Sequence, residues 1–570
     1  MNRLLCLILF IPVLLSGQSL VIRNVQLVDV EKRQLLPNYS VRITDNLITE
    51  VAPTKRLKVT AKDTIIEGEG KYLLPGLIDA HIHFFQSGGL YTRPDALDLR
   101  AVYSFEEEVK FGKANVTDYL QRYLRMGITT VMDVGGPMYN YTIRDSIAPL
   151  SINPNVLVTG PLFSIVARPQ LDLGDPPIIR VDTEADIDSL FKAQLPYRPD
   201  FMKVWYISSS NYPPAESFPR IKHLGDLCKQ SNLLLAIHAT QLETAQYAVK
   251  AGANILVHSI DDAIIPDDFV AELKAKNVTY IPTMIVSSGY GRTFTGNLRH
   301  DPQDLRWANP HAYGTLMDLY HIDTALWPGR LKNIFGREWP AGLSREDSIM
   351  QINLKKLNKA GVNIATGTDA GNIGTMHASS YLAELSAMQS AGLNNWDLLV
   401  ASTLNPAKGF GKVNELGSIA KGKRADMILL KENPLENIQS VNEPVWVIKS
   451  GQVLMPDEIH QESPEQLVQR QLNAYNARNI DAFMATYAEN IEIYDFNGDL
   501  LMKGQDPMRT RYQSMFENTP NLHCELVNRI VMGSTVIDQE HVRVGDRFID
   551  AVAIYTLADG KISQVTFVRP

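Results

Sequence analysis

Cysteine is scarce in this sequence, with three residues among 570. One of them, Cys6, lies in the apolar leader described below, so the chain that follows keeps only Cys228 and Cys524. A single pair separated by so much chain is no disulfide framework. We therefore expect two buried or idle thiols and no reaction that uses cysteine.

Long hydrophobic runs are also missing. The most apolar stretch, Leu4–Leu15, is shorter than the ~20 residues that a membrane-spanning helix needs. Arg3 precedes it and the small residues Ser16 and Gly17 follow it, which is the pattern of an export signal. We predict a signal peptide over residues 1–18, export to the periplasm or the extracellular space, and no membrane span.

Neither sign of charge is strongly in excess. The chain has 55 Lys and Arg against 63 Asp and Glu, a formal net charge of −8, which does not indicate a nucleic-acid-binding surface. Hydrophobic residues make up 45% and charged residues 21%, as in ordinary globular proteins. The chain is too long for one core, so we expect about three or four structural units.

Two strand-rich segments lie far apart in the sequence. Apolar and polar residues alternate over residues 19–73, and a similar pattern returns over residues 412–456. Two such segments can pair into one small β-sandwich that flanks an inserted domain. Residues 74–411, which lie between them, are then the inserted domain.

The inserted region alternates short apolar strands with helical segments. The strand candidates are residues 76–83, 129–133, 155–159, 201–205, 233–238, 254–258, 279–283 and 363–369. This alternation predicts a parallel sheet, and its eight strands predict a closed (β/α)8 barrel of the TIM type. The fold class of the main part is therefore α/β.

Two further segments interrupt or follow this rhythm. Residues 285–345, which contain Trp307 and Trp327, are an insertion after a barrel strand. Such an insertion is either a lid or substrate wall or a helical hairpin packed outside. Residues 463–570 follow a polar linker, and their helices followed by strands predict a separate α+β domain.

The stretch DAHIH, residues 79–83, carries the strongest chemical signal. Side chains alternate along a strand, so His81 and His83 point to the same side near its C-terminal end. Two imidazoles at this spacing can share one metal ion. An isolated pair of this kind is often incidental, so the interpretation depends on the other strands.

Polar groups also occupy the other predicted strands. His238, His258 and Asp369 each close one strand, at the end where barrel enzymes keep their active sites. Lys203 lies within the apolar strand FMKVW, where a charged amine is unfavourable without a partner. Each residue has an ordinary structural explanation, but their common position in one barrel favours a shared site.

These motifs resemble the amidohydrolase superfamily, in the branch of imidazolonepropionase-like and prolidase-like enzymes. LPGLIDAHIHF resembles the motif of the first barrel strand, HATQLETAQYAVKAGANILVHS that of the fifth and sixth strands, and GTDAG that of the eighth. LGSIAKGKRADMILL resembles the segment that returns to the small sandwich. The resemblance covers residues 20–454.

The resemblance implies a binuclear metal centre. Its ligands would be His81, His83, Lys203, His238, His258 and Asp369. The histidines of the first strand would bind the more buried ion together with Asp369, and the other two histidines would bind the second. Lys203 would carry a carbon dioxide adduct, a carbamate that bridges two divalent ions, expected to be Zn²⁺. Burial favours the neutral amine that a carbamate requires.

The implied reaction is hydrolysis of a C–N bond in a small molecule, a dipeptide or an N-acyl amino acid. Two metal ions would bind a hydroxide and polarise the scissile carbonyl, with Asp369 as general base and then acid. A lactonase, a cyclic amidase or a phosphoesterase would suit the same centre. A non-catalytic ligand-binding protein is a further alternative, which the complete ligand set opposes.

Residues around the centre are harder to assign from the sequence. Arg168, Tyr206 and His377 are candidates for substrate contact, with an ordinary loop role as the alternative. Asp79 is expected to brace a ligand or its strand rather than to act in catalysis.

The last domain resembles the SnoaL-like, ketosteroid-isomerase-like group through AYNARNIDAFMATYAENIEIYDF. Such domains are curved sheets over helices, and many pair into dimers, so we expect a homo-oligomer with this domain as the candidate interface. Asp495, His523 and His541 are candidates for a cavity acid or base. We favour a dimerising or ligand-holding role over a second active site.

Overall fold

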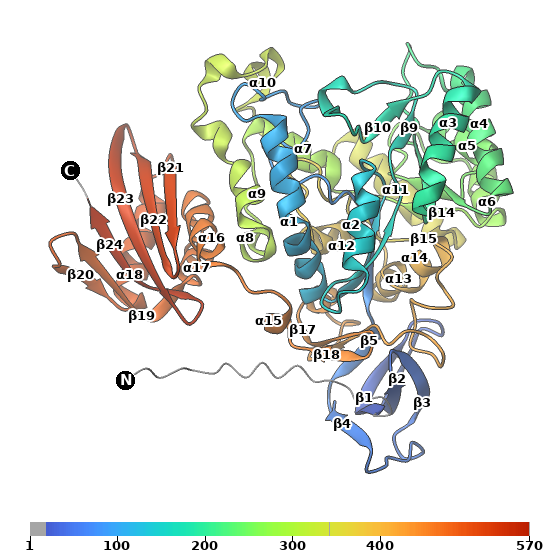
Figure 1. The fold of residues 1–570 in the computed structure, drawn as a ribbon, viewed down its shortest axis with the longest axis horizontal. Helices are drawn as coiled ribbons and strands as arrows, with labels where there is room; N and C mark the ends of the chain where they lie inside the picture. Colours follow the sequence, from blue (N-terminus) through green and yellow to red (C-terminus); the bar gives the residue numbers. More distant parts are fainter. Residues whose placement is uncertain (1–18, 341, 569–570) are drawn as a thin grey trace.

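The computed structural model describes residues 19–340 and 342–568 (Figure 1). A β-sheet unit lies at the bottom of the view, a helix-covered barrel above it, and a smaller unit with the C-terminus to the left. The predicted signal peptide, residues 1–18, lies outside the described residues and stays a prediction. Among the described helices, none combines the length and hydrophobicity that crossing a bilayer requires.

The sheet at the base is built from two segments that are distant in sequence. Its strands are β1 (Ser19–Asp29), β2 (Gln34–Thr44), β3 (Leu47–Pro53), β4 (Asp63–Glu67), β5 (Tyr72–Pro75), β16 (Met427–Leu430), β17 (Pro444–Lys449) and β18 (Gln452–Leu454). They form one sheet in the order β18-β17-β16-β5-β1-β2-β3, with β4 beside β1. The two segments join where β5 and β16 run antiparallel, with Leu73 opposite Leu429.

The central unit is a barrel. Its strands are β6 (Leu77–Ile82), β7 (Ile128–Asp133), β8 (Asn155–Val158), β11 (Phe201–Trp205), β12 (Leu234–His238), β13 (Ile255–Val257), β14 (Thr279–Ile281) and β15 (Asn363–Ile364). Neighbours pair in parallel from β6 to β8 and from β11 to β15. Asp200 N–H donates to the Val158 carbonyl at 3.1 Å, which connects β8 to the start of β11. The predicted barrel is confirmed.

Closure of the barrel depends on the segment after β15. Ala80 N–H donates to the Thr366 carbonyl at 2.9 Å, and Ile82 and Ala370 form a parallel bridge. The chain that begins the barrel at β6 therefore lies directly beside the chain that ends it. Two short strands, β9 (Leu162–Ser164) and β10 (Ile178–Arg180), extend the sheet from β11 above the barrel.

Helices cover the outside of the barrel. They are α1 (Phe105–Arg125), α2 (Tyr139–Ile147), α3 (Glu184–Gln194), α4 (Pro214–Gln230), α5 (Leu242–Ala251), α6 (Asp267–Ala275), α11 (Arg345–Ala360), α12 (Tyr381–Ser390), α13 (Asn395–Ala401) and α14 (Leu404–Gly409). In α1, Val116, Leu120 and Leu124 are buried at four-residue intervals, so one face of the helix packs inward.

The insertion after β14 is helical. It contains α7 (Val286–Thr295), α8 (Pro302–Trp307), α9 (Pro310–Thr315) and α10 (Gly329–Ile334). The last three pack with the loop after β6 in an apolar cluster of their own, around Leu90, Tyr313 and Leu331. This part of the insertion therefore packs outside the barrel core. That agrees with the second predicted alternative, helices packed on the outside, rather than with a lid or substrate wall.

The C-terminal unit has the predicted mixture of helices and strands. Its elements are α16 (Pro464–Asn476), α17 (Ile480–Met484), β19 (Tyr487–Asp495), β20 (Leu500–Lys503), α18 (Gln505–Asn518), β21 (His523–Met532), β22 (Thr535–Val544), β23 (Arg547–Ala558) and β24 (Lys561–Val568). The strands form one sheet in the order β20-β19-β24-β23-β22-β21. Its core includes Phe483, Tyr487 and Phe516.

The connection to this unit is packed rather than free. It contains the short helix α15 (Pro456–Ile459), and His460 Nε2 lies 2.8 Å from Asp118 Oδ1 on α1. Asn473 on α16 donates to the Pro310 carbonyl at 2.7 Å. The polar composition of this segment predicted a linker, but in the structure its residue His460 forms a hydrogen bond to the barrel helix α1.

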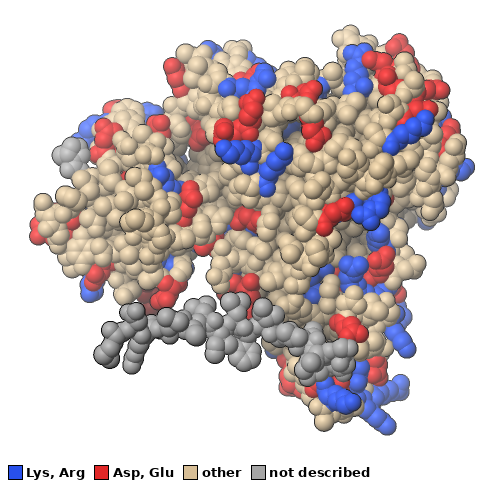
Figure 2. Space-filling view, in the orientation of Figure 1, with Lys and Arg blue, Asp and Glu red and all other residues tan. Residues whose placement is uncertain are grey.

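Charged side chains are mixed on the face of the molecule in Figure 2. Blue and red residues are interspersed over the barrel, while blue residues are the more frequent over the base sheet on that face. Neither sign dominates this face as a whole, in line with the mild net charge of −8.

The contact between α4 and α5 gives a test of the packing. A Cβ atom on Gly225 would lie 1.8 Å from the Ala251 carbonyl oxygen. We expect Gly225→Ala to lower the free energy of unfolding by about 1–3 kcal/mol, because backbone must move to relieve the overlap. The midpoint of thermal unfolding measures the effect. Gly329→Ala is the control, since nothing lies within 4 Å of its added Cβ. Equal midpoints for the two variants would contradict the packing.

Candidate metal centre

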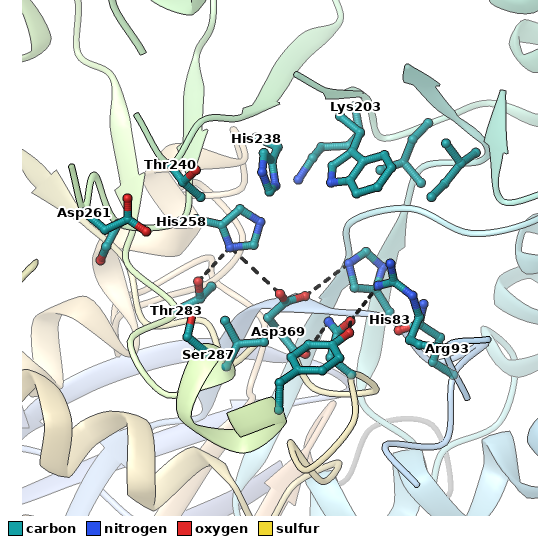
Figure 3. A pocket seen from close by; sticks show the side chains of 18 of the residues that line it. His83, Arg93, Lys203, His238, Thr240, His258, Asp261, Thr283, Ser287 and Asp369 are labelled. Atoms are coloured by element: carbon teal, nitrogen blue, oxygen red, sulfur yellow. Dashed lines mark hydrogen bonds and ion pairs between the residues drawn. The ribbon is translucent and has the colours of Figure 1, made fainter. Parts of the chain in front are cut away.

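The carboxyl ends of the barrel strands surround a cavity of about 260 Å³ (Figure 3). Its wall combines polar and charged side chains with apolar and aromatic ones, and strands, helices and loops all contribute. The wall includes His83, Phe85, Arg93, Leu162, Ile178, Lys203, Trp205, His238, His258, Thr283, Tyr290, Met350, Asp369 and Asn372. Residues far apart in the sequence thus meet at the end of the barrel that supports catalysis in such folds.

Three donor atoms meet at the end of β6. His81 Nε2 lies 3.2 Å from His83 Nε2, and each of these nitrogens lies 3.2 Å from Asp369 Oδ1. Ligands about 2.0–2.1 Å from a tetrahedral zinc ion lie about 3.4 Å apart, so this spacing fits one metal ion. Asp369 reaches the site because its N–H donates to the His81 carbonyl at 2.7 Å.

A second pair of imidazoles lies on the other side of Asp369. His238 closes β12 and His258 follows β13, and their ring centroids are 4.3 Å apart. His258 Nδ1 lies 3.8 Å from Asp369 Oδ2 and 2.8 Å from Thr283 Oγ1. His81, His258 and Asp369 each offer a ligand atom within 4.8 Å of the others. The carboxylate of Asp369 therefore lies between two pairs of histidines.

Lys203 extends from β11 into the same cavity, and Figure 3 shows its amine beside His238. The residue is only 1% exposed. Burial lowers the pKa of the amine to about 7, against the opposing charge of Asp369. A large share of the amine is therefore neutral near pH 7, the form that reacts with carbon dioxide.

The surroundings prepare these side chains to hold a cation. His83 Nδ1 lies 2.7 Å from the Gly135 carbonyl, which can only accept, so the proton is on Nδ1 and Nε2 presents its lone pair. Burial lowers the pKa of His81 to about 4 and that of His238 to about 3, so both rings are neutral ligands. Asp369 Oδ1 is buried and makes no hydrogen bond. The residues fit a metal centre.

Asp369 is ionised in this setting. Burial alone would raise the pKa of its carboxyl, but the neighbouring His81 and His83 outweigh burial and hold that pKa well below its usual range. The negative charge is therefore present at neutral pH, where it can bind a cation and accept a proton.

The backbone is unusual at three strand ends. His258, Thr283 and Asp369 have φ angles of 78°, 43° and 59°, in the left-handed region. This region is unfavourable for residues other than glycine, most of all for β-branched threonine. Strained conformations of this kind cluster at functional sites, where the fold holds a side chain in a required direction. Here all three side chains line the cavity.

Asp79 braces the centre, as expected. Its carboxylate accepts hydrogen bonds from Thr368 N–H at 3.1 Å, from Thr368 O–H at 2.7 Å and from His81 N–H at 3.3 Å. These bonds join β6 to the segment that carries Asp369. Asp79 is not among the described residues that line the cavity, and these hydrogen bonds give it a positioning role.

Two of the predicted substrate contacts have other partners. Tyr206 and His377 are not among the described residues that line the cavity. Side chains alternate along β11, so Tyr206 points away from the side that Trp205 occupies, and its O–H donates to the Pro214 carbonyl. His377 is buried, with Nε2 2.8 Å from the carbonyl of Gln86.

Arg168 lies near the rim rather than on the wall. Its guanidinium carbon is 4.7 Å from the centroid of the Trp205 ring, and Trp205 lines the cavity. Arg168 Nε also lies 3.4 Å from Asp95 Oδ2. The structure thus places Arg168 one residue away from the cavity, through Trp205.

Loop residues that the sequence analysis missed form one wall. Arg93 donates through Nε and Nη2 to Asp95 at 2.7 and 2.8 Å, and through Nη1 to Asn372 at 2.8 Å. Tyr290 O–H donates to the same Asn372 oxygen at 2.7 Å. Tyr290 lies on α7, so the first helix of the insertion is part of the wall. Arg93 and Asn372 lie in loops and belong to no recognised sequence motif. The one sequence signal that could have identified them is that they follow His83 and Asp369 closely in the chain.

The candidates in the C-terminal unit have separate partners. Asp495 lies on β19, His523 on β21 and His541 on β22. His523 Nε2 lies 2.9 Å from Nδ1 of His321 in the insertion, and His541 Nδ1 lies 2.7 Å from Asp550. The three residues therefore do not form one acid–base group.

Comparison with known proteins agrees with this geometry. Residues 72–454 match the Amidohydrolase family, and residues 468–565 match the SnoaL-like domain. An adenine deaminase of Paracoccus denitrificans (strain Pd 1222) is 39% identical over 65 residues, 11% of this chain and 11% of that protein. An imidazolonepropionase of Shouchella clausii (strain KSM-K16) is 30% identical over 108 residues, 18% of this chain and 24% of that protein. These matches thus span a quarter or less of the relatives' lengths.

Solved structures share the fold. A Xaa-Pro dipeptidase with bound methionine aligns with a TM-score of 0.58 at 20% identity, over 77% of this chain and 100% of that one. The ochratoxinase of A. niger aligns with a TM-score of 0.57 at 20% identity, over 77% of this chain and 96% of that one. The family match over residues 72–454 covers the whole barrel, and the chain belongs to the Amidohydrolase family.

Proposed function

We propose that this protein is a binuclear, metal-dependent hydrolase that cleaves a C–N bond in a small molecule, a dipeptide or an N-acyl amino acid. One observation carries the proposal: Nε2 of His81, Nε2 of His83 and Oδ1 of Asp369 lie 3.2 Å from one another at the base of a cavity. The deaminase and imidazolonepropionase relatives support hydrolysis at C–N bonds.

The ligands would divide between two ions. His81, His83 and Asp369 would hold the first, and the closely placed rings of His238 and His258 would hold the second. When bound, the ions supply Lewis-acid activation of water and of the substrate carbonyl. Zinc suits a donor set of imidazole nitrogens and carboxylate oxygens.

Lys203 is proposed to carry a carbamate between the two ions. Its amine is buried, faces the cavity and has a pKa lowered to about 7. A neutral amine can add to carbon dioxide, and loss of a proton then leaves a carboxylate-like anion on Nζ. The added negative charge would offset the charge of two cations in a buried site.

Asp369 is the group placed to move protons. Its Oδ1 faces the first pair of histidines, and its Oδ2 faces the cavity near His258 Nδ1 at 3.8 Å. Oδ2 would accept a proton from the attacking water and deliver it to the leaving nitrogen. The two oxygens thus separate the binding role from the transfer role.

The cavity wall supports a substrate that carries a carboxylate. Arg93 donates one hydrogen bond from Nε and one from Nη2 to Asp95, and one from Nη1 to Asn372. A guanidinium has five N–H donors, so two remain for a ligand. A carboxylate on the amine side or the acyl side of the scissile bond would use them.

Metal content tests the centre. We expect about two divalent ions per chain in the purified protein, and a clear decrease in Lys203→Ala with loss of activity, because the bridging anion is gone. Elemental analysis by mass spectrometry measures the ions. Added formate or acetate should restore part of the activity of this variant, since a small carboxylate can occupy the same space. Lys110→Ala, exposed on α1, is the matched control. A single ion unaffected by the Lys203 substitution would remove Lys203 from the site.

Substrate panels test the reaction. We expect turnover of dipeptides or N-acyl amino acids, and a decrease of at least about 100-fold in kcat for Asp369→Asn, which loses both ligand charge and proton transfer. Turnover of lactones, cyclic amides or phosphoesters in place of linear amides would select the alternative reaction on the same centre. An inactive protein that still holds its metals would favour a binding role.

We further propose that the protein forms a homo-oligomer through its C-terminal sheet. Ile530, Ile537 and Ile554 are register partners on β21, β22 and β23, so they share one face. Met532 and Phe548 lie on the same face by alternation and are 74% and 60% exposed. An apolar face of this extent favours a second copy as its cover.

Substitution on this face tests the oligomer. We expect Ile530→Glu to shift the protein towards the monomer, because it would bury a charge between two apolar faces. Analytical ultracentrifugation measures the mass. Leu150→Glu, at an exposed residue of the barrel, is the control. Identical masses for the parent and the Ile530 variant would contradict the proposal.

A further inference from the structure

A second cavity, of about 370 Å³, lies where the barrel meets the C-terminal unit. It is lined from α1, α9, α16 and β21, which lie next to one another in Figure 1, and from the loop after β6. The cavity is separate from the metal centre. In the loop after β6, Gln86 lines the barrel cavity and the next residue, Ser87, lines this one.

Two carboxyl groups face this cavity, a buried one on Glu108 and a half-buried one on Asp318, whose side chain is 26% exposed. Glu108 is 6% exposed, and its Oε1 accepts a hydrogen bond from Ser87 Oγ at 2.6 Å. Asp318 accepts a hydrogen bond from Tyr91 O–H at 2.7 Å. Both hydrogen-bond partners are neutral. Burial raises the pKa of Glu108 to about 6 and that of Asp318 to about 7.

The wall supplies no permanent positive charge. Among its described residues there is neither Lys nor Arg. His321 Nε2 lies 3.9 Å from Asp318, but its Nδ1 is paired with His523 at 2.9 Å. Burial lowers the pKa of both rings, that of His523 to about 3, so neither is a cation at neutral pH. The described wall residues thus supply no permanent cation to offset the two carboxylates, which is unfavourable above all for the buried Glu108.

Aromatic side chains complete the wall. The rings of Tyr91 and Tyr103 lie 5.0 Å apart, and Phe111 lines the same cavity. Aromatic faces attract cations and accommodate flat apolar groups. A volume of this size holds a small organic molecule. Aromatic faces beside two carboxylates therefore suit a ligand with an apolar body and a positive end.

We propose that this junction cavity binds a small organic ammonium ion, with its positive end between Glu108 and Asp318 and its apolar body against Tyr91, Tyr103 and Phe111. The C-terminal unit closes the cavity through α16 and β21, including Asn476 and Cys524. The site therefore exists only in the fused chain. It uses no metal ligand and does not depend on the hydrolase reaction.

A ligand series on the parent protein tests the charge preference. The probe is 2-phenylethylamine, with 2-phenylethanol and 3-phenylpropanoate as neutral and anionic analogues of similar size. Isothermal titration of the full-length, metal-loaded protein at pH 8 should give one amine site, with affinity at least about tenfold above that of either analogue. Equal affinity for the three compounds, or no binding of the amine, would overturn the proposal.

Variants locate the site. Glu108→Gln with Asp318→Asn should weaken amine binding at least about tenfold, because both anions are removed while shape is kept. Glu107→Gln, exposed on the same helix, should leave binding unchanged. Asp369→Asn should also leave it unchanged, and loss of binding there would move the amine to the barrel cavity and refute the proposal. A crystal soaked with 2-phenylethylamine locates the site without a variant, and we expect electron density for the amine beside Glu108.

Discussion

The closure of the barrel is the constraint on which the rest of the structure depends. The segment after β15 lies along β6 through the hydrogen bond from Asp369 N–H to the His81 carbonyl and the bonds from Thr368 to Asp79. If this pairing were lost, the carboxylate of Asp369 would not reach the two imidazoles of β6. The donor atoms that define the site are therefore a consequence of joining the first and last strands, and Asp79 stabilises that junction without touching the cavity.

The site combines groups that are unfavourable to bury separately. A lysine, an aspartate and three histidines line one small cavity, and His258, Thr283 and Asp369 on its wall adopt a left-handed backbone. Burial keeps the imidazoles of His81 and His238 neutral and brings the amine of Lys203 to a pKa of about 7, while Asp369 stays ionised. The fold holds these groups in place with buried hydrogen bonds behind them, which is the arrangement expected of a preorganised site.

The C-terminal unit is integrated with the barrel more closely than its sequence suggested. The connecting segment is anchored on α1 by His460, and α16 reaches the insertion through Asn473. One consequence is that the two units enclose a cavity between them, while the outer face of the sheet stays apolar and exposed. One surface of this small domain thus contacts the barrel, while another stays accessible to solvent.

Local patterns in the sequence determined the barrel strands and the positions of the polar residues on them. Alternation places His81 and His83 on one side of a strand, and local order places His238 at the end of β12 and His258 directly after β13. Asp369 was predicted to close a strand, but β15 ends at Ile364, so the position of Asp369 depends on its hydrogen bond to β6. The wall of the cavity was decided only by tertiary structure. Arg93, Asn372 and Tyr290 come from three loops, and their hydrogen bonds join residues that no local periodicity relates. Tyr206 and His377 show the same limit, because their partners lie on other elements. Strand periodicity depends on neighbouring residues, whereas a loop takes its shape from what it packs against.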